Sequence, residues 1–173
     1  MHDAVGAADL IVFSFPLYVD QLPAQLIEVL ELIAGERRSQ PTPRRQKIMA
    51  IVQCGFPETH QNRAACDIMQ QFSVEAGFEW AGALALGMGG AIAGRSLEKA
   101  GGMVRNTIKA LDLTATSLLC GGPVPREAVD LMAKPAMPKW LYLLMANWGM
   151  KSKAKKHGVG KLIYNKPYAA QPT

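Results

Sequence analysis

The chain has 173 residues, and its 49% hydrophobic and 19% charged residues are typical of one folded globular domain and exclude a disordered protein. Its three cysteines, Cys54, Cys66 and Cys120, are odd in number and widely spaced, which argues against a disulfide framework and a metal site. The chain opens without an apolar secretory leader and carries a net charge of +5, and we expect a cytoplasmic protein.

The positive charge gathers in two places. Arg37, Arg38, Arg44 and Arg45 crowd one loop, and six lysines crowd residues 151–166. Such clusters usually solvate a face of the protein, and a patch for phosphate-bearing ligands, nucleic acid or anionic lipid is the alternative. Because no aromatic residues are interleaved as in nucleic-acid-binding motifs, we expect no nucleic-acid partner.

The first predicted unit is a strand followed by a helix. Residues 10–15 form a continuous apolar run, as a parallel strand covered on both faces requires. Asp20 is a candidate helix cap, and Pro23 suits the first helical turn. Gly35 is expected to end the helix, and residues 36–46 are expected to form an exposed loop. The buried face of the helix carries apolar residues at helical spacing: Leu22, Leu26, Leu30 and Ile33.

Two further units repeat this order. The pattern predicts a strand at residues 48–53, a helix at 60–76 that ends at Gly77, and a third strand at 78–86. A helix capped by Ser96 then runs over residues 96–111, weakened by two adjacent glycines. Strands that alternate with helices indicate βαβ crossovers, and the sequence therefore predicts an α/β fold with a parallel sheet.

Only helices are predicted after residue 111. Residues 126–133 form a short helix, and residues 138–156 form a longer one that ends at Gly158. Its segment 140–150 is apolar on nearly every side but shorter than the roughly 20 residues that span a bilayer. We expect this segment to pack on the domain or on a second subunit rather than on a membrane. We predict a single domain over residues 1–173, with strand–helix units in 1–111 and a helical extension with a basic tail in 112–173.

Two motifs are candidates for chemistry. The glycines between Gly87 and Gly94 resemble a nucleotide-binding loop, but Ile92 stands where a dinucleotide fingerprint needs glycine. We therefore predict a flexible loop at the end of a strand and leave open whether it lies near a ligand. Cys54 with His60 would form a nucleophile and base, whereas Cys54 as a small packed residue is the simpler interpretation. No paired carboxylates, catalytic elbow or metal-ligand spacing occur, so no metal is expected and the catalytic residues are unknown.

Two turns are better candidates for binding. Residues 16–19 and 54–58 follow neighbouring predicted strands, where open α/β sheets bind ligands. Pro16 fixes the backbone so that the following amides can face a planar ligand, and Tyr18 adds an aromatic face. Gly55 allows close approach of the backbone, and Phe56 can cover a ring. The alternative is that both segments are ordinary turns.

The sequence around these turns carries a resemblance. Residues 9–26, DLIVFSFPLYVDQLPAQL, resemble the third strand and following loop of the flavodoxin-like NAD(P)H-dependent FMN reductases. Residues 47–58 are similar to the fourth strand and flavin loop of that family, and residues 138–158 to the C-terminal helix of one branch. The resemblance covers about residues 3 to 168 and rests on the order and spacing of three modest matches.

The resemblance implies a truncated flavodoxin-like three-layer sandwich with strands 3-4-5 of the family order and extra C-terminal helices. It also implies FMN as cofactor and NAD(P)H as co-substrate, with hydride transfer to a quinone, nitro compound or second flavin. The residues that it places against FMN come from the two turns: Pro16, Leu17, Tyr18, Val19, Cys54, Gly55, Phe56 and Glu58.

The family's first two strands and phosphate-binding loop have no counterpart in the sequence. We therefore expect the isolated chain to bind FMN weakly or not at all. We also expect a second copy, forming a dimer, or another polypeptide to cover the edge of strand 10–15. Two other functions stay open: a flavin-free interaction or dimerisation module, and a peripheral binder of anionic surfaces that uses the lysine-rich tail. The electron acceptor, the nicotinamide preference and the oligomer size stay open as well.

Overall fold

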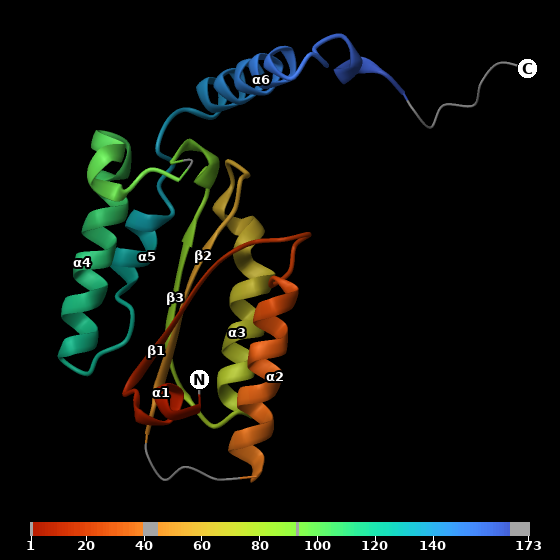
Figure 1. Ribbon diagram of the computed structural model, residues 1–173. Coiled ribbons are helices and arrows are strands. Elements are labelled where there is room, and N and C mark those ends of the chain that lie inside the picture. Colours follow the sequence, from red (N-terminus) through yellow and green to blue (C-terminus); the bar gives the residue numbers. More distant parts are fainter. Residues whose placement is uncertain (1, 40–44, 93, 167–173) are drawn as a thin grey trace, which may run out of the picture. The chain divides into compact units, whose positions relative to one another are not determined.

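The computed structural model describes residues 2–39, 45–92 and 94–166 (Figure 1). Contacts divide the chain into two compact units, Met1–Ala136 and Met137–Thr173, called here the first and second unit. The first unit contains the sheet, and the second contains one long helix.

A parallel three-stranded sheet lies at the centre of the first unit. Its strands are β1 (Leu10–Pro16), β2 (Lys47–Gln53) and β3 (Glu79–Leu86), in the order β1-β2-β3. The middle strand is the most deeply buried, and its Ile48, Ala50 and Val52 are fully inaccessible. The predicted α/β fold with a parallel sheet is confirmed.

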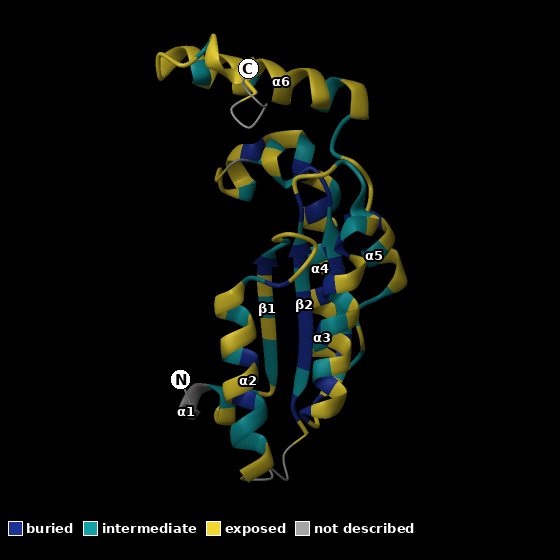
Figure 2. Ribbon diagram, turned by 90° about the vertical axis from the view of Figure 1, so that its right-hand side faces the viewer, coloured by how far each residue is buried: buried dark blue, intermediate teal, exposed yellow. Residues whose placement is uncertain are grey.

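Helices cover both faces of the sheet (Figures 1 and 2). Helices α2 (Ala24–Ser39) and α3 (Arg63–Glu75) lie over one face, where Leu30, Ile33 and Met69 pack on the even-numbered residues of β2. Helices α4 (Arg105–Leu119) and α5 (Arg126–Met132) lie over the other face, against its odd-numbered residues. The alternation of β2 thus supplies two separate cores.

The remaining elements are short, apart from one helix. The first unit also contains α1 (His2–Ala7) and the 3-10 helices η1 (Thr59–Asn62), η2 (Gly89–Ala91) and η3 (Leu97–Val104). The second unit contains α6 (Lys139–Lys156) and η4 (Leu162–Tyr164). Gly158, with φ +74°, follows α6 as predicted. Among the described residues, no helix is both long and apolar enough to cross a bilayer.

The expected stop at Gly35 is wrong, because α2 continues to Ser39. The contacts of the Arg37 side chain explain why the helix continues for another turn beyond Gly35. Its Nε donates to the carbonyl of Ala76 at 2.6 Å and its Nη2 to that of Gly77 at 3.0 Å, while the guanidinium lies 3.8 Å from the centre of the Phe78 ring. Arg37 is therefore a structural contact rather than part of a solvated cluster. Of the predicted loop 36–46, residues 36–39 are helical and 40–44 lie outside the described residues.

Two other helix predictions need correction. Asp20 does not cap α2, since its φ of +58° places it in a turn and the helix begins later, at Ala24. The helix expected over residues 96–111 is broken at Gly101, whose φ of 64° and ψ of −146° are accessible to glycine alone. The regular helix α4 starts at Arg105 and runs to Leu119. Gly77, with φ +71°, ends α3 as predicted.

Strand β1 lies at one edge of the sheet, and within the described part of the chain no strand pairs with its other side. Asp9 accepts a bond from Lys47 and Leu17 donates one to Gln53, so the odd-numbered residues of β1 bond to β2. The backbone groups of Val12 and Ser14 therefore face the open edge. Pro16 faces it too, where its missing N–H removes no ladder bond.

Candidate functional site

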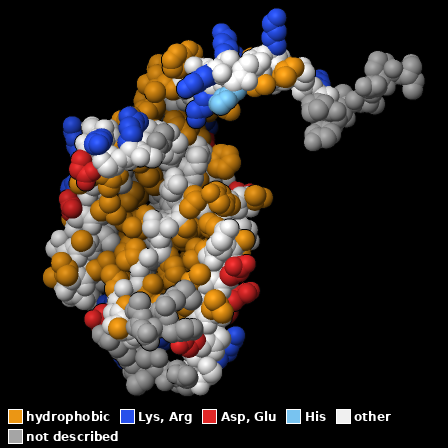
Figure 3. All heavy atoms as spheres, viewed as in Figure 1, with side chains coloured by type: hydrophobic (Ala, Val, Ile, Leu, Met, Phe, Trp, Pro, Cys, Tyr) orange, Lys and Arg blue, Asp and Glu red, His pale blue; other side chains and the backbone are white. Residues whose placement is uncertain are grey.

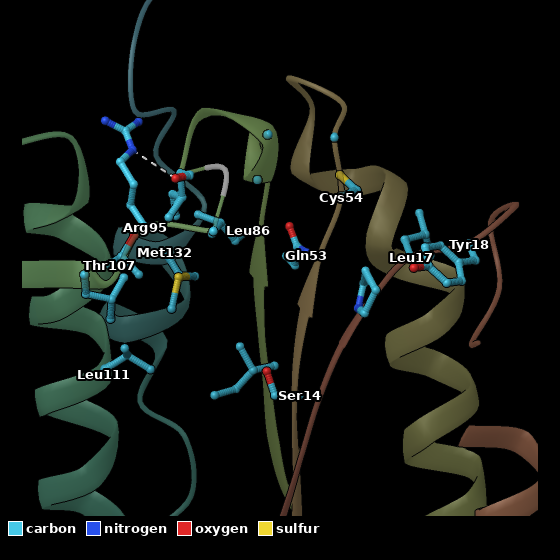
Figure 4. A pocket seen from close by; sticks show the side chains of 18 residues that line it. Ser14, Leu17, Tyr18, Gln53, Cys54, Leu86, Arg95, Thr107, Leu111 and Met132 are labelled. Atoms are coloured by element: carbon cyan, nitrogen blue, oxygen red, sulfur yellow. Dashed lines mark hydrogen bonds between the residues drawn. The ribbon is translucent and has the colours of Figure 1, made fainter. Parts of the chain in front are cut away.

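A cavity of about 640 Å³ lies at the carboxyl ends of the three strands, on the face that α4 and α5 cover (Figure 4). The parallel register explains its floor: Ser14 lies beside Ile51, and Pro16 lies beside Gln53, which in turn lies beside Leu86. All five of these residues line the cavity. Figure 3 shows hydrophobic side chains gathered around a hollow in the surface of the first unit.

The turn after β1 forms one wall. Pro16, Leu17 and Tyr18 line the cavity, and Tyr18 remains 59% exposed. The turn itself is tight, because Tyr18 and Gln21 exchange backbone hydrogen bonds of 3.0 and 2.9 Å across only two residues. Those two residues, Val19 and Asp20, have φ angles of +49° and +58°, as in a type I′ turn.

This geometry corrects the expected role of the amides. The N–H of Leu17 donates to the carbonyl of Gln53 at 2.8 Å, and the N–H of Tyr18 donates to that of Gln21. The proline at position 16 had suggested that these amides would face a ligand. Neither N–H is free to do so. Val19 does not line the cavity, and its side chain is almost fully exposed. At the cavity, the first turn thus offers the side chains of Leu17 and Tyr18 rather than their amides.

The turn after β2 forms the adjoining wall. Cys54 and Gly55 line the cavity, and the N–H of Cys54 is bonded to the carbonyl of Leu86 at 3.0 Å. A Cβ atom at Gly55 would meet nothing within 4 Å, so the backbone there borders open space. Phe56 and Glu58 do not line the cavity, and the Phe56 side chain is half exposed.

The Cys54 thiol is a packed group. Asn62 donates from Nδ2 to Sγ at 3.5 Å, and the sulfur lies 3.7 Å from the carbonyl oxygens of Phe56 and Glu58. Burial raises the pKa of the Cys54 thiol, so it stays protonated at neutral pH. The structure favours the packed interpretation over a thiolate nucleophile activated by His60.

The glycine loop after β3 closes the cavity on a third side. Gly89, Gly90 and Gly94 line it, which settles where this loop lies. The N–H of Gly89 donates to the carbonyl of Cys54 at 2.8 Å, and a Cβ atom at Gly89 would overlap Oε1 of Gln53. Any larger residue at position 89 would displace the end of the Gln53 side chain from that space.

Several lining residues were not identified from the sequence. Thr107 and Leu111 of α4 and Met132 of α5 reach the cavity from elements that no local motif marks. Gln53 could have been identified from the sequence, since it is a polar residue at the end of an apolar strand. Arg95 also lines the cavity, and its guanidinium donates to the carbonyls of Ala91 and, at 3.0 Å, Ile92.

The charges of the lining limit its chemistry. Within the described residues it contains no carboxylate, histidine or lysine, and Arg95 is its cation. Nowhere among the described residues of the chain do three His, Cys, Asp or Glu side chains form a group that could hold a metal ion. The cavity therefore suits a largely apolar ligand and offers no evident general acid or base.

Comparison with known families adds a second line of evidence. A family model described as NADPH-dependent FMN reductase matches residues 1–91, just over half of the chain. The chain belongs to the NADPH-dependent FMN reductase family. The matched segment contains all three strands, both turns and η2. Membership suggests NAD(P)H-dependent FMN reductase activity and, in general, the use of FMN and NAD(P)H. No curated protein and no solved structure matches the chain.

Proposed function

We propose that the cavity binds the isoalloxazine ring of FMN and that this FMN reductase family member passes electrons from NAD(P)H to a quinone, nitro compound or second flavin in the cytoplasm. One observation carries the proposal. The two turns predicted from the sequence, residues 16–19 and 54–58, meet at one cavity at the carboxyl edge of the sheet through Pro16–Tyr18 and Cys54–Gly55. This edge is where open α/β folds bind ligands.

The cavity fits a flavin ring in size and character. Its volume of about 640 Å³ lies in the range of small-molecule sites. Gly55 leaves room for a flat ligand against the backbone, and Tyr18 can lie against its face. Because the nearby amides of Leu17, Tyr18 and Cys54 are already bonded, the ring would be held by its faces more than by its edges.

The lining residues would bind and orient rather than exchange protons. Leu17, Ile51 and Leu86 contribute apolar surface to the cavity, and the Gln53 amide and the Ser14 hydroxyl are the polar groups of its floor. The chemistry that a bound flavin would supply is the redox step itself, in which hydride is taken from NAD(P)H and electrons are passed to the acceptor.

Titration of the full chain with FMN and with riboflavin, followed by flavin fluorescence, tests the proposal. Both ligands should bind, with dissociation constants weaker than about 1 μM, because Arg95, already bonded to its own loop, is the one cation of the described lining. Gly55→Leu should abolish binding by filling the cavity. Gly35→Leu, on α2 at the other face of the sheet, is the control that should bind normally. Binding of neither flavin, or normal binding by Gly55→Leu, would refute the proposal.

A second candidate is a flavin-free dimerisation module. It is supported by the open edge of β1, where Val12 is 47% exposed. If two copies pair through this edge, Val12→Pro should abolish the dimer by removing an outward N–H, while Val12→Thr should keep it. Light scattering coupled to size exclusion measures the change. A wild-type monomer at all concentrations would contradict this candidate.

A further inference from the structure

We propose that the second unit binds the surface of membranes that contain anionic lipids. The contacting parts are the apolar first half of α6 and a set of lysines called here the basic tail: Lys151, Lys153, Lys155, Lys156, Lys161 and Lys166. This function is separate from the cavity of the first unit.

Charge is divided sharply between the two units. Residues 1–136 carry 12 basic and 14 acidic side chains, whereas residues 137–173 carry seven lysines and no acidic residue. The second unit is thus more positive than the whole protein, whose net charge is +5. A positive segment without internal carboxylates attracts an anionic surface rather than pairing with itself.

The same unit exposes large apolar side chains. No residue of α6 is buried, and Trp140, Leu144 and Trp148 are 67%, 60% and 73% exposed. Their spacing of four residues places them on one face of the helix. Further exposed apolar residues of the unit are Leu143, Met145, Met150, Val159, Leu162, Ile163 and Tyr164. So large an apolar surface indicates a partner with an apolar interior.

Apolar and basic residues separate along the axis of α6 rather than across it. Apart from Lys139 at its first position, the basic residues of α6 begin at Lys151 and follow the apolar segment 140–150. Tryptophan is enriched at the boundary between headgroups and acyl chains, and lysine stems can extend from that boundary to the headgroups. Since α6 is too short and too polar to span, a position along the surface fits its composition.

The composition favours lipid over the other possible occupants. All seven basic residues are lysines, whose compact charges suit diffuse attraction, whereas arginine is preferred for directional contacts to nucleic acid or protein carboxylates. A second copy of this unit would bring seven more lysines against the first seven. Like charges at such density oppose self-association.

Flotation of the full chain with phosphatidylcholine vesicles, with and without about 30% phosphatidylserine, tests the inference. The protein should float with the anionic vesicles alone and should be released at about 0.5 M salt, which screens the attraction. Equal flotation with neutral vesicles, or none with either, would overturn the inference.

Two charge variants separate the basic tail from net charge. Replacing Lys151, Lys153, Lys155 and Lys156 by Gln should weaken vesicle binding by about tenfold or more. The matched control replaces four exposed basic residues of the first unit by Gln: Arg63, Lys99, Lys109 and Lys134. It removes the same charge and should keep its binding. Equal losses in both variants would contradict a specific role of the tail.

Quenching of tryptophan by brominated lipids locates the contact. Trp140 and Trp148 should be quenched, and the double variant Trp140→Phe/Trp148→Phe, which retains Trp80 of β3, should lose the quenching. Quenching that persists in the double variant would place the contact in the first unit. Tight binding of duplex DNA or RNA without vesicle binding would assign the lysines to nucleic acid instead.

Discussion

The two units of the chain treat their apolar side chains in opposite ways. In the first unit they fill two cores on either side of β2, where Ile48, Ala50, Val52 and Leu84 are fully inaccessible. In the second unit α6 buries no residue, and its tryptophans are mostly exposed. The first unit is therefore stabilised by its own packing, whereas the second unit has an apolar surface that is available to a partner.

The same leucine substitution in both units gives the largest expected contrast. Leu84→Ala removes a fully buried side chain from the core beneath α5 and should cost about 2–5 kcal/mol of unfolding free energy. Leu144→Ala changes an exposed side chain of α6 and should cost less than about 0.5 kcal/mol. Urea unfolding followed by circular dichroism measures both. Comparable losses would mean that α6 packs as a core element.

A second contrast lies within α2, between neighbouring arginines. Arg37 bonds to the carbonyls of Ala76 and Gly77 and, at 2.5 Å, to Oε1 of Gln46, whereas Arg38 is exposed and has no partner among the described residues. Arg37→Ala should therefore cost about 2–3 kcal/mol, since charge-assisted hydrogen bonds and a ring contact are lost together. Arg38→Ala should be nearly neutral. Thermal melting of the two variants under one buffer compares them directly, and a neutral Arg37→Ala would show that the contacts are dispensable.

The sequence predicted the features of the first unit that depend on local patterns. The apolar runs gave the three strands, and the turns at Pro16 and Cys54 were correctly placed at the carboxyl ends of neighbouring strands. Gly35 was misjudged as a stop, because the contacts that hold the next turn come from Ala76 and Gly77, about 40 residues away. Tertiary contacts of this kind outweigh the weak helix propensity of one glycine.

The rest of the cavity could not be predicted for a related reason. Thr107, Leu111 and Met132 reach it through the packing of α4 and α5, and neither their type nor their spacing signals a ligand. The pairing of the Leu17 and Tyr18 amides depends on the β1–β2 register and on the two-residue turn, which the sequence alone does not specify. Local chemistry thus predicts which turns meet, and only the packed structure shows which of their groups remain available.

The turn at Val19 tests whether the first unit also contains strain. A β-branched residue at φ +49° is unfavourable, and type I′ turns prefer Asn followed by Gly. The double variant Val19→Asn/Asp20→Gly should therefore stabilise the protein by about 1 kcal/mol. Denaturant midpoints measure the change, with Val159→Asn in the second unit as an exposed valine control that should be neutral. A destabilised double variant would show that the Val19 side chain makes a contact that outweighs the strain.

The smallest expected effect is a pH dependence from Cys66 on α3. Burial, and to a lesser degree the neighbouring Asp67, raise the pKa of the Cys66 thiol to about 11. As pH rises above the ordinary thiol pKa, the unfolded chain loses this proton while the folded chain keeps it, so the folded state becomes less stable. Because the side chain is only partly buried, the loss at pH 10 should be less than about 1 kcal/mol. Cys66→Ala should remove this increment between pH 8 and pH 10, and Cys120→Ala, at an exposed position, should retain it. Identical pH profiles for wild type and Cys66→Ala would mean that the thiol ionises equally in the folded and unfolded chains, and that the packing of α3 on the sheet does not exclude water from position 66.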